Sequence, residues 1–224
     1  SQCIAPEQYN YDTAQVIAKH IVDFNNMIID KSHKHHSFVE TFSLQKGLRK
    51  FGNKGRDAAF NEMKQLHDRS AFTPVNINTL STQEKRRALD SLIFLVEKRD
   101  GRIKARTCAN GSTQKVYMTK EQAASPTAMI ESIMLTGAIE AKENRDIMTV
   151  DIPNAFIQTK METDGDERII MKIRGPLVDM LVELDPKTYS GYEVNEGKSK
   201  VLYVQVLKAI YGMLQSSLLF YKKL

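Results

Sequence analysis

A short stretch near the middle of the chain strongly constrains its fold. Residues 92–96 are all apolar, and the pair Asp100-Gly101 follows after a brief polar interval. Apolar runs of this length bounded by turn residues are typical of buried strands, and Asp-Gly favours a two-residue hairpin turn. Residues 102–107 should form the returning strand, on which Lys104 and Arg106 point to the same face because they are two positions apart. The sequence therefore predicts a basic β-hairpin.

Other patterns predict further elements on both sides of this hairpin. Ser81 and Glu84 have the spacing of a capping box, which predicts a helix at residues 81–89. Ser125-Pro126 predicts an N-cap and a first helical position, with a helix to about residue 143 whose inner face carries Met129, Ile133 and Met134. Helices are also expected at residues 55–68 and 176–184 and from Tyr211-Gly212 onward. Strands are expected at residues 147–151 and 168–173, with a hairpin at 193–206. Helices and hairpins segregate along the chain, so the predicted fold class is α+β.

The first 43 residues differ from the rest. They contain one amphipathic pattern, at residues 13–29, followed by a stretch at residues 31–37 with three histidines and two lysines. We interpret that stretch as a polar linker, with adventitious metal binding as the alternative, because adjacent histidines without a distant ligand make a poor specific site. Residues 1–43 are expected to be a partly disordered upstream segment, and residues 44–224 a domain. The absence of an initiator Met suggests a piece of a longer polyprotein.

Charge is unevenly distributed along the chain. The net charge is +5, yet residues 46–115 alone contain sixteen Lys and Arg against seven Asp and Glu. Such a basic block suits a phosphate-rich partner, although a solvated basic face without a partner explains it equally well. The two cysteines, Cys3 and Cys108, are too few for a disulfide framework. No apolar run approaches the roughly 20 residues needed to span a bilayer. An intracellular protein is expected, with no membrane partner.

The predicted strand at residues 147–151 ends in the carboxylate of Asp151, within the run Thr149-Val150-Asp151-Ile152-Pro153-Asn154-Ala155-Phe156. This run resembles the first catalytic motif of copia-type retrotransposon reverse transcriptases. Three further segments resemble motifs of that family in the same order, namely Lys104-Ala105-Arg106, Ala109-Asn110-Gly111-Ser112-Thr113-Gln114 and Ala209-Ile210-Tyr211-Gly212-Met213-Leu214-Gln215-Ser216. The resemblance extends over roughly residues 44–224.

The resemblance implies the fingers (about residues 44–145) and the beginning of the palm (about residues 146–224) of a right-hand polymerase. It implies that the Asp151 carboxylate and the Ile152 carbonyl bind Mg²⁺ or Mn²⁺, and that Phe156 packs under the sugar of the incoming deoxynucleotide. The residues expected to contact nucleotide are Lys104, Arg106, Tyr211, Gly212 and Gln215. Each has a plainer interpretation: Asp151 as a turn residue, Phe156 and Tyr211 as core aromatics, Lys104 and Arg106 as surface cations.

One part of the family pattern is missing. Reverse transcriptases carry a second carboxylate pair in a Tyr-x-Asp-Asp hairpin, and no Asp-Asp occurs in this sequence. Leu214 also replaces the usual lysine of its motif. We therefore expect part of an RNA-directed DNA polymerase that does not polymerise by itself. The implied partners are RNA template, RNA–DNA hybrid, deoxynucleoside triphosphates, and the integrase and ribonuclease H segments of the polyprotein. The implied location is a cytoplasmic virus-like particle, with the nucleus as an alternative. A non-catalytic nucleic-acid-binding remnant and a basic structural or assembly protein are the competing functions.

Overall fold

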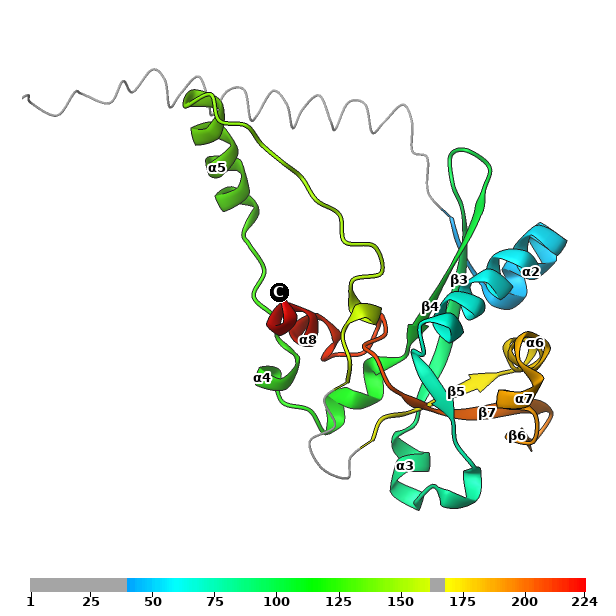
Figure 1. Ribbon diagram of the computed structural model, residues 1–224. Coiled ribbons are helices and arrows are strands. Elements are labelled where there is room, and N and C mark those ends of the chain that lie inside the picture. Colours follow the sequence, from blue (N-terminus) through cyan, green and yellow to red (C-terminus); the bar gives the residue numbers. More distant parts are fainter. Residues whose placement is uncertain (1–39, 162–167) are drawn as a thin grey trace, which may run out of the picture. The chain divides into compact units, whose positions relative to one another are not determined.

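The basic hairpin is present and forms part of the sheet. The computed structural model describes residues 40–161 and 168–224 (Figure 1). Strands β3 (Leu89–Glu97) and β4 (Ile103–Ala109) pair antiparallel, from Ser91 opposite Ala109 to Glu97 opposite Ile103. The turn is closed by the Asp100 carboxylate, which accepts the Arg102 N–H at 3.0 Å. The predicted hairpin is confirmed, and its first strand begins earlier than expected.

Seven strands form one mixed sheet within the described residues. The remaining strands are β1 (Thr41–Ser43), β2 (Phe72–Pro74), β5 (Ile170–Arg174), β6 (Glu193–Glu196) and β7 (Ser199–Val206). The order is β1-β3-β5-β7-β2, with β4 added on β3 and β6 on β7. All pairs are antiparallel except β3 with β5, which run parallel through Leu89 and Asp90. The strands predicted near β5 and the β6–β7 hairpin are confirmed, and the class is α+β.

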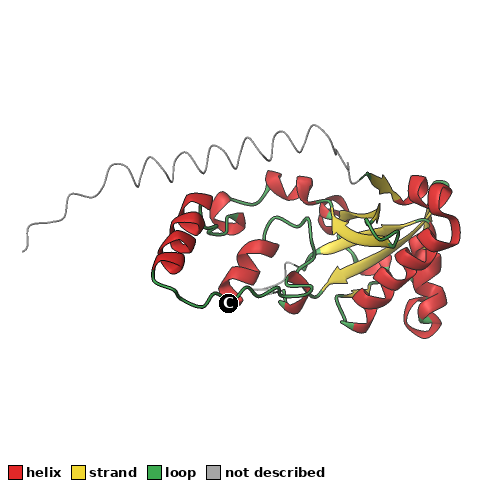
Figure 2. Cartoon of the chain, turned by 90° about the horizontal axis from the view of Figure 1, so that it is seen from above, coloured by secondary structure: helices red, strands yellow, loops and turns green. Residues whose placement is uncertain are grey.

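Two helices share a core with the sheet. Helix α2 (Leu44–Asp68) buries Ala59, Met63 and Leu66, the residues whose helical spacing predicted it. Its first part was missed because Gly52, at φ 54°, interrupts the helical backbone. Helix α6 (Pro176–Leu184), which has the predicted bounds, buries four apolar side chains and lies beside α2 (Figure 1). Figure 2 shows the strands flanked by helices. This packing gives the sheet its largest apolar cluster.

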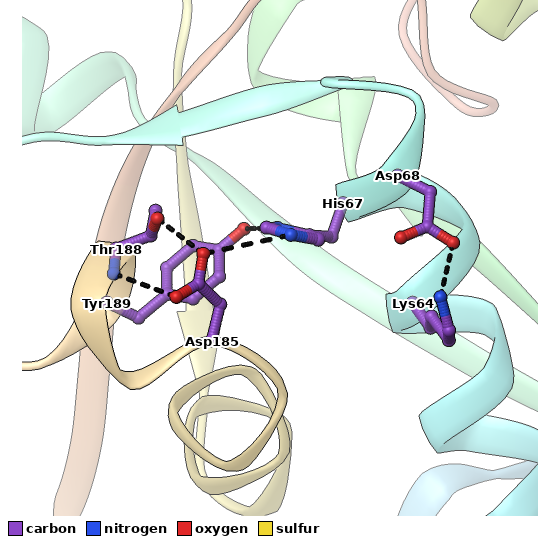
Figure 3. Close-up of polar contacts among 6 residues, drawn as sticks. All are labelled: Lys64, His67, Asp68, Asp185, Thr188 and Tyr189. Carbon is purple, nitrogen blue, oxygen red and sulfur yellow. Dashed lines mark hydrogen bonds and ion pairs between the residues drawn. The ribbon is translucent and has the colours of Figure 1, made fainter.

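A polar cluster joins the end of α2 to α7 (Pro186–Tyr189) (Figure 3). His67 Nδ1 lies 2.9 Å from the hydroxyl of Tyr189, whose side chain is almost wholly buried. Burial, together with the charge of Asp185, raises the pKa of Tyr189 to about 12. Asp185 accepts hydrogen bonds from the backbone N–H and the hydroxyl of Thr188 and lies 3.9 Å from His67 Nε2. The cluster ties together two helices more than a hundred residues apart in sequence.

The predicted capping box is also present. In α3 (Thr82–Arg87), Ser81 Oγ accepts the Glu84 N–H at 3.2 Å, and the Glu84 carboxylate accepts the Ser81 N–H at 2.7 Å. Glu84 additionally binds Arg168 Nε at 2.6 Å. The Arg168 bond and the Ser81 backbone bond lower the pKa of the Glu84 carboxyl to about 2. One residue therefore caps a helix and links it to the segment just before β5.

Helix α5 (Ile130–Lys142) departs from prediction in two ways. It begins after Met129, so Ser125-Pro126 lies in the extended segment that precedes it and is not its N-cap. Its expected inner face is exposed, since Met129, Ile133 and Met134 are 67%, 61% and 49% accessible. Ile133 and Met134 lie in a helix as predicted, but no other described element covers their side chains.

Two further expectations near the C-terminal half are wrong. Residues 147–151 form no strand and pair with no other described strand; Val150 is 70% exposed. Helix α8 (Ser216–Lys223) begins five residues after Tyr211, because Gly212 has φ 89°, which a right-handed helix excludes. The expected amphipathic pattern at residues 13–29 and the histidine-rich stretch at 31–37 lie outside the described residues. The short elements η1 (Ile77–Thr79), η2 (Gly111–Val116), α4 (Lys120–Ala123) and η3 (Phe156–Gln158) complete the described fold.

Candidate functional site

Two of the motif segments are in direct backbone contact, Ala109–Gly111 against Tyr211–Gly212, and we call this contact the Gly111–Gly212 lock. The Ala109 N–H donates to the Tyr211 carbonyl at 2.7 Å. A side chain on Gly212 would place its Cβ 2.2 Å from the Ala109 carbonyl oxygen, and one on Gly111 would meet the Gly212 oxygen at 2.3 Å. Both distances are shorter than any real contact, so each glycine is required by the close approach of the other segment. Gly212 was expected to let the backbone approach a ligand closely, and in the structure it allows the close approach of the Ala109 backbone.

Gln114 completes this lock from within the core. Its side chain is fully buried, and its Oε1 accepts the Leu214 N–H at 3.0 Å. A buried backbone N–H without a partner costs about 1–3 kcal/mol, so this bond helps to fix the path of the chain beyond Gly212. The sequence placed Gln114 in a motif without giving it a role. A glutamine in a polar stretch normally predicts an exposed side chain, so nothing in the local sequence indicated that Gln114 is buried.

Aromatic side chains from distant segments gather beside this lock. The Phe156 ring lies 4.7 Å from the Tyr211 ring and 6.0 Å from the Phe220 ring, measured between centroids. Phe156 is half-buried, and Tyr211 is 37% exposed. The structure thus brings together two residues that the sequence singled out separately, and adds Phe220, which it did not. Partial exposure leaves ring surface for a ligand as well as for packing.

The segment after Phe156 explains how it reaches Tyr211. Thr159 accepts the Ala209 N–H at 2.9 Å, and Met161 donates to the Leu207 carbonyl at 2.9 Å. These bonds align the chain after η3 with the residues just before Tyr211. At the far end, the Lys223 ammonium donates to the Gln158 carbonyl at 2.7 Å, which holds α8 against η3.

Lys104 and Arg106 lie on β4 and are exposed, whereas the alternate residues Ala105 and Thr107 are buried. This confirms that the two cations share a face. Ala109, at the end of the same strand, is bonded to the Tyr211 backbone, so Arg106 lies three residues, or about 10 Å of strand, from that bond. No described contact joins the two cations to the aromatic group.

A carboxylate beside these cations is held in an unusual environment. Glu62 of α2 accepts the Thr107 N–H at 2.8 Å. Burial raises the pKa of the Glu62 carboxyl above its ordinary value, although the Thr107 bond and the charges of Lys104 and Arg106 act in the opposite direction. Burial and the nearby Glu62 also raise the pKa of the Cys108 thiol. Glu62 therefore closes part of the open edge of β4 rather than pairing fully with either cation.

Asp151 and Ile152 stand apart from this arrangement. Asp151 is exposed in the irregular segment between α5 and η3, and Ile152 is 36% exposed (Figure 1). No group of three His, Cys, Asp or Glu side chains suitable for a metal occurs in the described parts of the chain. The carboxylate and carbonyl oxygens are hard donors that suit Mg²⁺ or Mn²⁺, but the two together are too few to hold a pair of metal ions. Their role as ligands remains a prediction.

Gln215 lines a hollow together with residues of α3, of α8 and of the segment leading into β5. Neither Phe156 nor Tyr211 lines that hollow, so the expected nucleotide-contacting residues do not gather in it.

Comparison with protein-family models, with curated proteins and with solved structures found no match to this chain. Among the described residues, no helix combines the length and apolar character required to cross a membrane.

Proposed function

We propose that this chain is the front part of an RNA-directed DNA polymerase of a copia-type retrotransposon, comprising its fingers and the beginning of its palm. The observation that carries the proposal is the convergence of separate motifs. The segment from Ala109 to Gln114, the aromatic residue Phe156 and the segment from Tyr211 to Leu214 meet at one place. Segments that resemble one family and also assemble into one site support a shared role better than scattered matches would.

In this proposal the aromatic pair forms the floor under a nucleotide sugar. Phe156 and Tyr211 present partly exposed ring surface, and the Gly111–Gly212 lock keeps Tyr211 at a fixed position. Arg106 can hold a phosphate with two parallel hydrogen bonds, whereas Lys104 acts as a point charge. The backbone of an RNA–DNA hybrid would follow the same basic hairpin, because phosphate contacts dominate such binding.

No chemical step is assigned to this chain alone. Nucleotidyl transfer of this kind uses two divalent metal ions that stabilise the attacking and leaving oxygens. Asp151 and the Ile152 carbonyl would supply two of the ligands, and the described residues offer no group of three that would complete the set. We therefore expect nucleotide and hybrid binding without primer extension.

The test measures binding and extension separately. A labelled RNA–DNA hybrid should bind at low salt and weaken steadily as salt rises. The double variant K104A/R106A should bind it less well than K98A/R99A, which removes the same charge from the tip of the same hairpin. Equal binding by both variants would contradict the assigned phosphate contacts. Templated extension by the pure protein would contradict the incomplete metal site.

The second candidate is a nucleic-acid-binding remnant without catalytic use of Asp151. The exposed position of Asp151 outside any three-ligand group favours it. The variant D151N distinguishes the two. If Mn²⁺ strengthens deoxynucleotide binding by the native chain and not by D151N, the polymerase proposal holds. If D151N and the native chain respond equally, the remnant is the better description.

A further inference from the structure

An arginine and a tyrosine form a cation–π stack outside the site described above. Arg87 ends α3, and its guanidinium carbon lies 4.5 Å from the centre of the Tyr117 ring, just after η2. With its amide oxygen turned toward Arg87, Gln83 accepts hydrogen bonds from both terminal guanidinium nitrogens at 3.2 and 3.0 Å. The Arg87 guanidinium thus contacts both the Tyr117 ring and the Gln83 amide, and it joins α3 to the end of η2.

The stack is the shared wall of two hollows. One, of about 630 Å³, lies between α3, α4, α8 and the segment leading into β5. The other, of about 740 Å³, lies between α3 and η2. Arg87, Tyr117 and Gln83 line both. The guanidinium and the ring are therefore exposed to two hollows at once.

The chemistry of the two hollows is similar. The hollow beside α8 has apolar surface from Leu218 and Leu219 and a cation from Lys222. The hollow beside η2 has apolar surface from Val116, which is 89% exposed, and a cation from Arg86. Each hollow therefore offers an aromatic ring, an apolar side and a positive group, and the hollow beside α8 is also lined by Glu84 and Glu121. An unpaired nucleotide presents the matching features, namely a planar base and a phosphate.

We propose that the Arg87–Tyr117 stack binds single-stranded nucleic acid, with unpaired bases of one strand entering the two hollows that it lines. Stacking on aromatic and guanidinium planes tolerates any base and is worth most for bases that are not already paired. The bases of a duplex are stacked on each other and cannot enter. The site accordingly prefers a single strand to a hybrid. It requires neither Asp151 nor a metal, so it stands independently of the polymerase proposal.

The experiment measures anisotropy of a fluorescein-labelled oligoadenylate RNA in EDTA, alone and annealed to complementary DNA. The native chain should bind the single strand more tightly than the hybrid. Tyr117→Ala and Arg87→Ala should weaken single-strand binding about tenfold and leave hybrid binding within about twofold. Tyr117→Phe keeps the ring and should bind like the native chain. Arg87→Lys keeps the charge without the plane and should lose most of the affinity.

Arg102→Ala is the matched charge control, because Arg102 is an exposed cation at the hairpin tip away from both hollows. It should lower the salt dependence of binding slightly, whereas Tyr117→Ala should lower affinity at unchanged salt dependence. Circular dichroism melts of Tyr117→Phe and Arg87→Lys check that the variants are folded. Three results would overturn the proposal: equal losses for hybrid and single strand, affinity of Arg87→Lys equal to native, or equally tight binding of a polyglutamate peptide.

Discussion

Gln114 and Leu214 are one hundred residues apart in the chain, and the buried side-chain oxygen of Gln114 accepts the Leu214 N–H at 3.0 Å. The Gln114 Nε2 has no hydrogen-bond partner among the described residues. One buried amide thus combines a favourable bond with an unsatisfied donor. What the amide supplies here is the bond to Leu214, because an apolar side chain would fill the same space without the unsatisfied nitrogen.

Replacement of Gln114 should separate these contributions. Gln114→Ala leaves the Leu214 N–H unsatisfied and opens a cavity, so the free energy of unfolding should fall by about 2–4 kcal/mol. Gln114→Met fills the space without an acceptor and should lose about 1–2 kcal/mol. Urea denaturation measures both. No loss for Gln114→Met would show that volume, not the bond, stabilises this position.

Gly212 should be far less tolerant of substitution than a glycine of the same backbone conformation. Gly212 and Gly191 both have φ 89°, but a Cβ on Gly191 would meet nothing within 4 Å. Gly191→Ala should cost only the left-handed strain of about 1–2 kcal/mol. Gly212→Ala adds a collision with the Ala109 carbonyl and should cost at least about 2 kcal/mol more. Thermal denaturation of the two variants makes the comparison, and similar melting temperatures would contradict the close packing of the two segments.

Glu84 should make stability depend on pH in the acid range. Its pKa in the folded protein is about 2, below its ordinary value, chiefly because of the bond to Arg168. A carboxyl whose pKa is lowered by folding stabilises the protein above its ordinary pKa, and the contribution is lost as pH falls toward the folded value. Glu84→Gln should therefore lower the melting temperature at neutral pH and have little effect near pH 2. Asp179→Asn, which removes an exposed partner of Lys200, is the control and should change the melting temperature little at either pH.

The cluster in Figure 3 should contribute to stability through the Tyr189 hydroxyl. Tyr189→Phe keeps the buried ring and leaves His67 Nδ1 without its partner at 2.9 Å. The expected loss is about 0.5–1.5 kcal/mol in the free energy of unfolding. The exposed Tyr192→Phe should have no measurable effect. A loss for Tyr189→Phe no larger than for Tyr192→Phe would show that the hydroxyl's contact with α2 is energetically neutral.

Local patterns predicted many of the elements well. The apolar run at β3 with the Asp100-Gly101 turn, and the Ser81–Glu84 capping box, were recognisable because turn geometry and capping depend on residues only a few positions apart. The predicted strand at residues 147–151 failed for the opposite reason. A strand needs a hydrogen-bonded neighbour, and no described strand pairs with this segment.

The candidate site could be predicted only in part. Phe156, Tyr211, Lys104 and Arg106 were identified from motifs that resemble a family, yet their mutual positions were not. Nothing in the local sequence indicates that Phe156 contacts Tyr211, because the hydrogen bonds of Thr159 and Met161 to residues 207–209 create that contact. The stack of Arg87 on Tyr117 is equally invisible, since the two residues belong to different elements.

By itself the sequence determined the hairpin, the capping box and the basic charge of residues 46–115, since each of these depends on composition or on short-range spacing. Only the tertiary structure decided that Gly111 and Gly212 are required by each other, that Gln114 is buried, and that α5 presents its apolar side chains to solvent. Those features depend on contacts between segments far apart in the chain, and such contacts form only when the chain folds.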